Sequence, residues 1–145
     1  MSTLVRELMT TKVLTLQDHN KMIVVQEVMG WAHIRHIPVL DAQHHVVGIV
    51  SHRDLLNAAI SSVSEVTPIE RRQHLWAIRL SAVMETEVQT IAPDATIQEA
   101  AARMRAGKIG CLPVVEAGRL VGIISEYDLL GVVVALPAGK DVAAA

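Results

Sequence analysis

The sequence predicts an α+β fold built from two similar repeats, each a short strand, a helix, two strands and a helix. Three observations support this prediction. Motifs between residues 9 and 56 recur about 75 positions later. Val- and Ile-rich runs alternate with helical patterns in each copy. The apolar residues, 51% of the 145, are almost all aliphatic, with no Phe. That length suits one domain or two small packed halves.

The repeat is defined by three motifs in the same order. Residues 9–15 and 84–90 share the pattern Met-x-x-x-Val-x-Thr, and residues 38–39 and 113–114 are both Pro-Val. The second copy then lacks one residue, after which residues 48–56 match 122–130 as Gly-h-h-Ser-x-x-Asp-Leu-Leu, where h is aliphatic. An ordered set of this kind indicates an internal duplication.

In the first copy, a helix is predicted over residues 20–31, with Met22, Val25 and Met29 facing inward. Residues 38–40 and 46–50 follow as two strands around a polar turn, which indicates a β-hairpin. The last helix of each copy begins at the Ser that follows the hairpin, Ser51 or Ser125.

In the second copy, Thr96 and Glu99 form a capping box that predicts the start of the equivalent helix. Gly107 is expected to end it. Its predicted apolar stripe consists of Ile97, Ala100, Ala101 and Met104. The Met residues at 9, 22, 29, 84 and 104 are interpreted as core.

A further helix is predicted between the copies, because Thr67 can cap it, Pro68 suits its first turn and Glu70 completes a capping box. An apolar face made of Ile69, Gln73, Trp76 and Leu80 would pack it against the rest of the chain. The predicted organisation is repeat 1 (5–61), linker helix (62–79), repeat 2 (80–136) and a loose C-terminal tail (137–145).

Composition argues against several protein classes. A net charge of −2 with 19% charged residues does not favour nucleic-acid binding or disorder. The longest apolar run, residues 129–136, is too short to span a membrane. The N-terminus lacks a signal-peptide core and Cys111 is the only cysteine, so we expect a cytoplasmic protein without disulfides.

The repeated Gly-h-h-Ser-x-x-Asp motif has two interpretations. Ser followed three residues later by an acid is a capping box, so Ser51 and Ser125 can be purely structural. The same geometry suits a nucleotide, because a helix N-terminus and a Ser hydroxyl offer hydrogen bonds to phosphate. A carboxylate beside them can accept hydrogen bonds from both hydroxyls of a ribose.

The three motifs together resemble a tandem pair of CBS domains, known as a Bateman module, over about residues 5–136. The resemblance implies two pseudo-symmetric β-α-β-β-α halves packed sheet to sheet. It also implies a ligand in the cleft between the repeats: AMP, ADP, ATP, S-adenosylmethionine, NAD or a cyclic dinucleotide. A homodimer and a separate effector protein are the implied partners.

The resemblance also assigns nucleotide-binding roles. Asp54 and Asp128 would bind ribose hydroxyls, and Ser51 and Ser125 would contact ribose or phosphate. First-strand positions that read the adenine edge correspond to Lys12, Val13, Glu87 and Val88. Aliphatic positions that line the base correspond to Ile37 and Leu112. Positions that often contact phosphate, before Pro-Val, correspond to Arg35 and His36.

The two copies differ in charge at these positions. The first copy has Arg53 between Ser and Asp, in addition to Arg35 and His36, which favours phosphate. The second has Tyr127 in place of Arg53, Gly110 and Cys111 before its Leu-Pro-Val, and Glu126 where the first has His52. We therefore expect one competent site, the one using Asp54. The other is either empty or specific for a less charged ligand such as a nucleoside.

Other reactive side chains are interpreted as structural or solvated. No metal site is predicted, since the seven His residues show no ligand spacing; for His36, phosphate contact is an equal alternative. Cys111 is expected to be a packed small hydrophobe. Arg71 and Arg72 suit a solvated face, with a dimer or phosphate contact as the alternative.

The function hypotheses follow from these assignments. The first is a regulatory sensor that binds an adenine nucleotide, requires no cofactor and acts through another protein. The alternative is a structural dimerisation or docking module with a degenerate ligand site. Catalysis is not predicted, because no nucleophile, base and orienting group converge in the sequence.

Overall fold

The computed structural model describes residues 2–60 and 67–136, which form two compact units. Unit 1 comprises Met1–Thr11, Thr90–Glu116 and Val121–Ala145, and unit 2 comprises Lys12–Gln89 and Ala117–Leu120. Both contain helices and strands, so the α+β prediction is confirmed. The predicted tail (137–145) and part of the predicted linker (61–66) lie outside the described residues.

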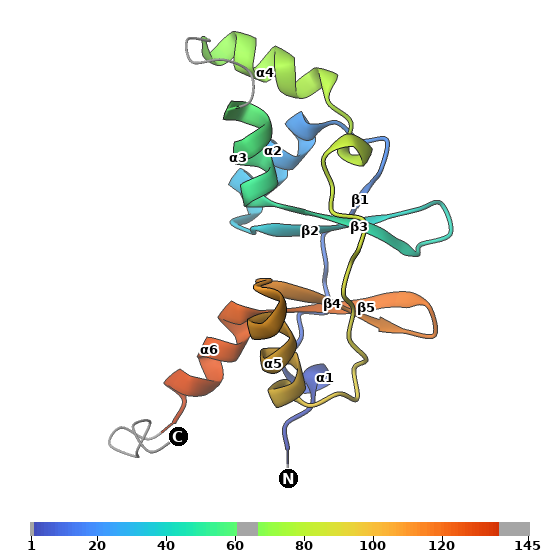
Figure 1. Cartoon of the computed structure of the whole chain (residues 1–145), viewed down its shortest axis with the longest axis vertical. Helices are drawn as coiled ribbons and strands as arrows, with labels where there is room; N and C mark the ends of the chain where they lie inside the picture. The colour runs from blue at the N-terminus through green and yellow to red at the C-terminus, as the bar shows by residue number, and fades with distance from the viewer. Residues whose placement is uncertain (1, 61–66, 137–145) are drawn as a thin grey trace. The chain divides into compact units, whose positions relative to one another are not determined.

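Unit 2 holds a three-stranded sheet in the order β1–β2–β3. β2 is antiparallel to β3, as the hairpin pattern predicted, and runs parallel to β1. Helices α2 and α3 lie on the same face of this sheet (Figure 1). The elements are β1 (Leu16–Gln17), α2 (Met22–Ala32), β2 (His36–Leu40), β3 (Val46–Ser51), α3 (His52–Ile60), α4 (Pro68–Ala77) and the 3₁₀ turn η1 (Leu80–Ala82).

Helix α2 supplies much of the core of unit 2. Met22, Val25 and Met29 are buried at helical spacing, as predicted, and pack with the strand residues Ile37 and Val50. The helix ends at His33, whose positive φ of 53° places it in the left-handed region usually occupied by Gly.

Helix α4 begins as predicted but packs through a different residue. The Thr67 side chain accepts a hydrogen bond from Glu70 N, and Glu70 completes the capping box. The predicted apolar face was wrong, because Ile69 is 70% and Trp76 56% exposed. Leu75, 1% exposed, is the buried residue through which α4 packs against α2 and α3.

The error has a geometric cause. Leu80 is fully buried but belongs to η1, because α4 ends at Ala77. It therefore cannot extend a stripe along α4. The face centred on Leu75 is turned toward α2, where Arg72 also pairs with Glu27 (Nη2–Oε1 2.6 Å).

Unit 1 contains a two-stranded sheet formed by the second hairpin. The expected first strand of this copy is reduced to one parallel bridge between Ile91 and Val114. Pro93 lies two residues further on and has no N–H to donate, which limits extension of this strand. The elements are α1 (Val5–Leu8), α5 (Ile97–Gly107), β4 (Cys111–Glu116), β5 (Arg119–Ser125) and α6 (Glu126–Val134).

Helix α5 follows the prediction at its start and departs from it later. Thr96 Oγ1 accepts a hydrogen bond from Glu99 N at 3.1 Å, while the Glu99 carboxylate pairs with Arg103 at 3.4 Å instead of turning back to the cap. Of the predicted stripe, Ala101 is exposed and the others are buried. Gly107 is the last helical residue, as predicted, and Lys108 (φ 51°) follows in the left-handed conformation.

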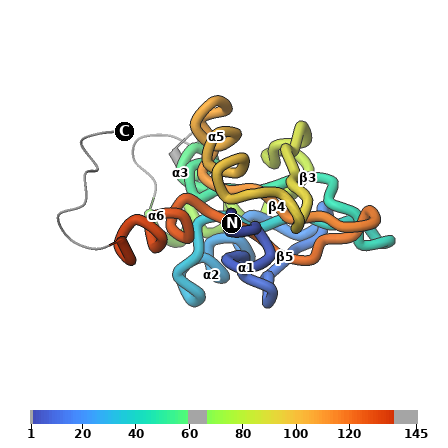
Figure 2. The backbone as a smooth tube through the Cα atoms, turned by 90° about the horizontal axis from the view of Figure 1, so that it is seen from below, coloured from blue at the N-terminus to red at the C-terminus, as the bar shows by residue number. Residues whose placement is uncertain are grey.

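Each unit takes one segment from the other sequence repeat. Thr10, from the first copy, forms an antiparallel bridge with Ile123 on β5, and the two segments lie side by side in Figures 1 and 2. Glu85, from the second copy, forms the equivalent bridge with Ile49 on β3. The repeat boundaries, which stay a prediction, therefore differ from the compact units.

The exchanged segments are held by a matched pair of contacts. A Cβ built on Gly122 would lie 2.6 Å from Met9 Sδ, and one built on Gly48 would lie 2.5 Å from Met84 Sδ. Each Met therefore covers a strand Gly that leaves space for it. Met9 and Met84, predicted as core, are partly buried and pack against the core clusters of unit 1 and unit 2, respectively.

The longest apolar run, residues 129–136, includes the last six residues of α6. Among residues 2–60 and 67–136, no helix is both long enough and apolar enough to cross a bilayer.

Candidate functional site

Both Gly-h-h-Ser-x-x-Asp motifs form the same hydrogen-bonded turn at a strand-to-helix junction. Asp54 Oδ2 accepts from Ser51 N at 2.8 Å and from Ser51 Oγ at 3.0 Å, at the start of α3. Asp128 Oδ2 accepts from Ser125 N at 2.8 Å and from Ser125 Oγ at 3.1 Å, at the start of α6. The sequence repeat is thus also a repeat of geometry.

The carboxylate in each turn uses one oxygen for the cap. All hydrogen bonds to Asp54 and Asp128 from the described residues go to Oδ2, so Oδ1 of each keeps its acceptor capacity. Both side chains are part-buried, not enclosed. The structural and the ligand-binding interpretations are therefore compatible, because capping occupies only half of each carboxylate.

The backbone before each Pro-Val reaches the same turn. His52 N donates to Arg35 O at 2.8 Å, and Glu126 N donates to Gly110 O at 2.9 Å. These bonds bring the residue before β2 to the first turn of α3, and Gly110 before β4 to the first turn of α6. The backbone of Arg35 therefore lies beside the Ser51 motif, and the predicted contact of its side chain with phosphate stays a prediction.

The exchanged segments change which candidates lie beside which motif. Glu85 pairs with Ile49 on β3, the strand that leads to Ser51. Glu87 and Val88 follow Glu85 closely in the chain, so their segment starts beside the first motif. Thr10 pairs with Ile123 on the strand that leads to Ser125, whereas Lys12 and Val13 belong to unit 2 and their place in a site stays a prediction. Sequence order alone would have grouped each segment with the motif of its own repeat.

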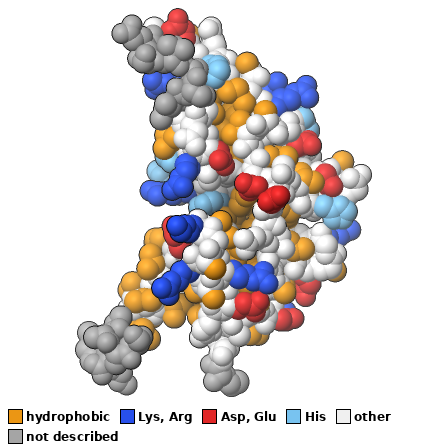
Figure 3. All heavy atoms as spheres, in the orientation of Figure 1, with side chains coloured by type: hydrophobic (Ala, Val, Ile, Leu, Met, Phe, Trp, Pro, Cys, Tyr) orange, Lys and Arg blue, Asp and Glu red, His pale blue; other side chains and the backbone are white. Residues whose placement is uncertain are grey.

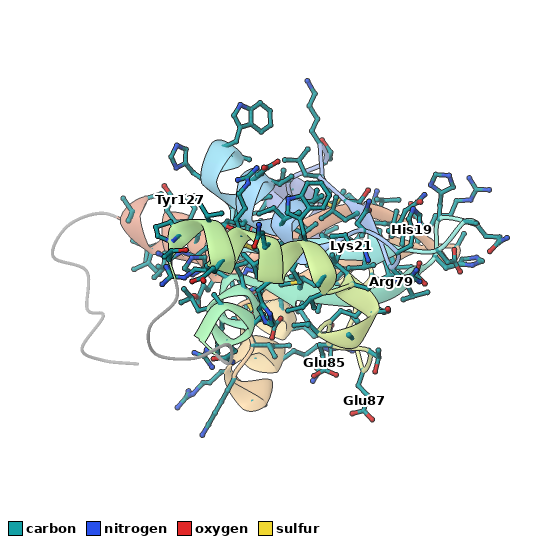
Figure 4. The ribbon with its side chains drawn as sticks, turned by 90° about the horizontal axis from the view of Figure 1, so that it is seen from above. His19, Lys21, Arg79, Glu85, Glu87 and Tyr127 are labelled. Atoms are coloured by element: carbon teal, nitrogen blue, oxygen red, sulfur yellow. The ribbon has the colours of Figure 1, made fainter. Side chains whose placement is uncertain are left out.

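Charge around the first motif is mixed. Arg35, His52 and Arg53 are exposed, and His36 is half-buried at the start of β2. Glu85 and Glu87 add negative charge from the exchanged segment, and the two lie close together (Figure 4), with Glu87 N donating to Glu85 Oε1 at 2.9 Å. The sequence analysis missed Glu85, because its position depends on the bridge to Ile49, which no local pattern indicates.

Around the second motif the described side chains carry less positive charge. Glu126 and Tyr127 occupy the first turn of α6, and Tyr127 is 82% exposed. Thr10 lies on the paired segment, and Gly110 precedes the strand. The contrast with Arg35 and Arg53 in the first motif follows the charge difference seen in the sequence.

The predicted base-lining residues are not at a surface. Ile37 and Leu112 are both 0% exposed and belong to the hydrophobic clusters of unit 2 and unit 1, respectively. Their place in a ligand site stays a prediction, and any such role would need their packing to open.

Comparison with known proteins identifies the family. The family model for the CBS domain matches residues 5–61 and 80–135, most of the chain. The chain belongs to the CBS-domain family. A CBS domain-containing protein of Dictyostelium discoideum is 30% identical over 135 residues, which cover 92% of this chain and 93% of that protein.

Solved structures also show the CBS fold. A Vibrio cholerae protein, AcuB, named for acetoin utilization, is 35% identical and superposes with a TM-score of 0.76, covering 92% of each chain. The CBS domain pair of protein MJ0100, in complex with 5′-methylthioadenosine and S-adenosyl-L-methionine, superposes at 0.78 over 92% of this chain and 97% of that one, with 21% identity. The low identity of this second structure shows shared fold alone.

CBS sequences like this one also occur within enzymes. A homoserine O-acetyltransferase from Methanosphaerula palustris is 32% identical over 128 residues, which are 88% of this chain but 23% of that protein. This chain therefore spans about a quarter of the enzyme's length.

The cysteine of the second CBS repeat is a packed residue. Cys111 is 5% exposed at the start of β4. Burial, and then the negative charge of Glu126, raise the pKa of the Cys111 thiol to about 12. A thiol with so high a pKa is a poor nucleophile at neutral pH, which supports its interpretation as a small hydrophobe.

This raised pKa predicts a stability loss at alkaline pH. The folded protein retains the Cys111 proton above the ordinary thiol pKa of about 8.5, so unfolding becomes easier as pH rises from there toward 12. The Cys111 thiol should lower the free energy of unfolding by up to about 1.4 kcal/mol for each pH unit in this range. Urea titrations between pH 7 and 10.5 should show a shallower decline for Cys111→Ala than for wild type; identical slopes would contradict the prediction.

Among residues 2–60 and 67–136, no group of three or more His, Cys, Asp or Glu side chains is placed to hold a metal ion. The backbone hydrogen bond from His45 N lowers the pKa of Asp41, helped by the hydrogen bond from Gln43 N and by the His45 ring, 3.4 Å away across the hairpin turn. Arg71 is exposed, as predicted for a solvated face, whereas Arg72 is held by Glu27.

Proposed function

We propose that this CBS-domain protein is a regulatory module that binds an adenosine-containing ligand at its Ser–Asp helix starts. The observation that carries the proposal is the doubled turn, in which Asp54 and Asp128 each keep one carboxylate oxygen outside the cap. A free carboxylate oxygen beside a helix N-terminus can accept from ribose hydroxyls while nearby N–H groups favour phosphate.

Related folds support the choice of ligand class. The MJ0100 pair was crystallised with 5′-methylthioadenosine and S-adenosyl-L-methionine, and the protein CBSX2 with AMP. CBSX2 is 20% identical to this chain, with a TM-score of 0.77 over 91% of this chain and 97% of that one. All three ligands contain adenosine, so a ribose diol is the shared feature that an Asp at these positions would recognise.

The two motifs differ in charge, so each favours a different kind of adenosine-containing ligand. Arg35, His36 and Arg53 favour a ligand with phosphate at the Asp54 motif, with Ser51 as a further donor. Glu85 and Glu87 oppose high negative charge there, which favours AMP over ATP. At the Asp128 motif, Glu126 favours a ligand without phosphate, such as a nucleoside or a sulfonium nucleoside.

The output of binding would be read by a separate effector protein in the cytoplasm. Ligand binding changes a partner's response only through a difference in affinity between two states of the module. The acetyltransferase from Methanosphaerula palustris matches this chain over 23% of its own length, so a similar segment occurs as a minor part of an enzyme chain.

The competing hypothesis is a docking module with a degenerate site. It is favoured by the fact that capping alone accounts for every described hydrogen bond made by the side chains of Ser51, Asp54, Ser125 and Asp128. On this hypothesis, the two motifs only start α3 and α6, and no nucleotide changes the stability of the protein.

Thermal denaturation with a ligand panel separates the two hypotheses. We expect AMP or an adenosine analogue, at 100 times its Kd, to stabilise the protein by about 2.7 kcal/mol, a rise in Tm of about 2–4 °C per kcal/mol. Asp54→Ala should remove the response to AMP, and Asp128→Ala the response to 5′-methylthioadenosine.

A matched control is available in α4. Glu70 closes the capping box of Thr67 in the same way but lies outside both motifs. Glu70→Ala should lower stability by the loss of a cap, about 1 kcal/mol, and leave both ligand responses intact. A flat response of the wild type across AMP, ATP, S-adenosylmethionine, NADH and cyclic di-AMP would favour the docking module instead.

A further inference from the structure

The start of α2 in unit 2 carries two positive charges directly opposite each other. Lys21 and Arg79 form an isolated antiparallel bridge. The backbone hydrogen bonds lie beside this pair and not within it, as in the bond from Met22 N to Ile78 O at 2.8 Å. In such a non-hydrogen-bonded pair the two side chains share a face and lie especially close. The Lys ammonium and the Arg guanidinium therefore start from neighbouring positions on one face.

Neither charge is neutralised within the part of the chain that the structure describes. No ion pair there includes Lys21 or Arg79. Figure 4 shows His19 on the same side of the unit, with Glu85 and Glu87 apart from all three. Arg79 and His19 are exposed and Lys21 is half-buried, so these three residues form a basic cluster that is open to solvent.

This position is unfavourable for Lys21 in two ways. Lys21 is the N-cap residue of α2 and makes no side-chain cap hydrogen bond, and its charge lies at the positive end of the helix dipole. Like charges directly opposite each other in an antiparallel pair also repel. Residues that break local rules without a structural gain are typical of functional sites, and an anion bound at the cluster would relieve both costs.

The second repeat has a neutral pair at the same place. Leu4 and Thr96 form the equivalent antiparallel bridge in unit 1, each 75 positions from its counterpart, Arg79 or Lys21. Thr96 caps α5 by accepting a hydrogen bond from Glu99 N. The duplicated fold therefore does not need cations at this bridge, and the positive pair is a property of the first copy alone.

The position of His19 differs in the same sense. It corresponds to Asp94 of the second copy, which forms an ion pair with Arg6. In the first copy the nearby acid is Asp18, whose Oδ1 lies 3.8 Å from His19 Nδ1. A His in place of an acid removes one negative charge from beside Lys21. Each member of the basic cluster is thus more positive than its counterpart in unit 1.

We propose that the basic cluster binds the phosphate group of a small molecule, with Lys21 and Arg79 as the main contacts and His19 beside them. A phosphate monoester carries about −1.5 to −2 charges at pH 7, which matches the two cations. Arg supplies a planar pair of donors and Lys a compact charge, and phosphate oxygens accept from both.

The spacing of the charges favours a compact ligand. Lys21 and Arg79 lie opposite each other, so one tetrahedral anion can contact both, whereas the carboxylates of an acidic peptide are spread at about 3.3 Å per residue. On the face that Figure 3 shows, Lys and Arg side chains occur in small groups with acidic side chains among them. That face therefore lacks the broad basic surface typical of nucleic-acid binding.

The basic cluster lies at the opposite end of the sheet from the Ser51 motif. Ser51 pairs with His36 at the start of β2, whereas Gln17 of β1 pairs with Leu40 at its end. Lys21 follows four residues after Gln17, and α2 then leads back toward His36. The proposed phosphate site is therefore separate from the candidate nucleotide site, and it does not rest on the proposed function.

Nuclear magnetic resonance titration of the ¹⁵N-labelled full chain tests the proposal, with inorganic phosphate and glycerol 3-phosphate as probes at constant ionic strength. Amide signals of residues 19–22 and 78–80 should shift and saturate. Lys21→Met and Arg79→Met should each weaken binding at least about tenfold, because each removes a charge-assisted hydrogen bond. Tighter binding of glycerol 3-phosphate than of phosphate would indicate an ester as the ligand.

Arg71→Met is the matched control for net charge. Arg71 is exposed on α4 in the same unit, and no described ion pair includes it. Its replacement should leave the phosphate affinity unchanged. Asp54→Ala should also leave it unchanged, since the two sites are separate.

A double variant separates binding from folding. Lys21→Thr with Arg79→Leu installs the pair that unit 1 already contains. In phosphate-free buffer its Tm should exceed that of the wild type, because a cap is gained and the repulsion is lost. Added phosphate should raise the Tm of the wild type and not that of the double variant.

Four results would overturn the proposal. Shifts that do not saturate, or that sodium chloride reproduces, would mean charge screening only. Equal weakening by Arg71→Met and Lys21→Met would mean a general charge effect. Tighter binding of a poly-glutamate peptide than of both phosphates would make an acidic protein segment the occupant. A double variant with a lower Tm than the wild type in phosphate-free buffer would show that the cations serve the fold.

Discussion

Replacing Leu75 with Ala should lower the free energy of unfolding by about 2–5 kcal/mol, the range for removing a buried Leu side chain. Leu75 is 1% exposed and is the one buried residue of α4. It joins α4 to the cluster that contains Met22 and Leu80. Chemical denaturation monitored by circular dichroism measures the change, and the cavity left under α4 is its physical cause.

Ile69→Ala provides the control on the same helix. Ile69 is 70% exposed, so its truncation should change stability by less than about 0.5 kcal/mol. A larger loss of stability for Ile69→Ala than for Leu75→Ala would instead support the apolar face first predicted for this helix. It would also show that α4 packs through a different side from the one described.

Gly122→Ala should destabilise unit 1 by about 1–3 kcal/mol through overpacking. The added Cβ would lie 2.6 Å from Met9 Sδ and 3.0 Å from Thr10 O. The sulfur can move aside but the backbone oxygen cannot move without disturbing the bridge between Thr10 and Ile123. Adding Met9→Ala removes the nearer contact. The double variant should therefore be about 1 kcal/mol more stable than the summed stability losses of the two single variants imply.

A second double variant tests the exchange of segments. Met84 belongs to the same sequence repeat as Gly122 but lies over Gly48 in the other unit. Gly122→Ala combined with Met84→Ala should therefore be additive within about 0.5 kcal/mol. Rescue by Met84→Ala instead of Met9→Ala would contradict the exchanged arrangement.

Most secondary structure was predictable because it depends on local signals. The helix starts at Thr67 and Thr96 follow from side chains that cap the backbone within three residues. The hairpin of β2 and β3 follows from aliphatic runs around a polar turn. The end of α5 at Gly107 was also predicted, and the following residue, Lys108, adopts the left-handed conformation.

In the candidate site, too, contacts between residues close in the chain were predictable and contacts between distant segments were not. The turn of Ser51 with Asp54, and that of Ser125 with Asp128, was predictable because its partners are three residues apart. The neighbours from distant segments were not, because each comes from the opposite repeat. The buried state of Ile37 likewise depends on the cluster around it, which no local pattern specifies.

The sequence by itself determined the duplication, the α+β class, the CBS family resemblance and the two Ser–Asp helix starts, because each rests on residues close together in the chain or on the repeat itself. The tertiary structure decided which segment lies beside which motif, which residue anchors α4, and that the apolar run of residues 129–136 leaves Leu130 and Val134 exposed. These outcomes depend on packing between elements far apart in sequence, where a stripe of apolar residues shows that burial is favourable but not what will cover it.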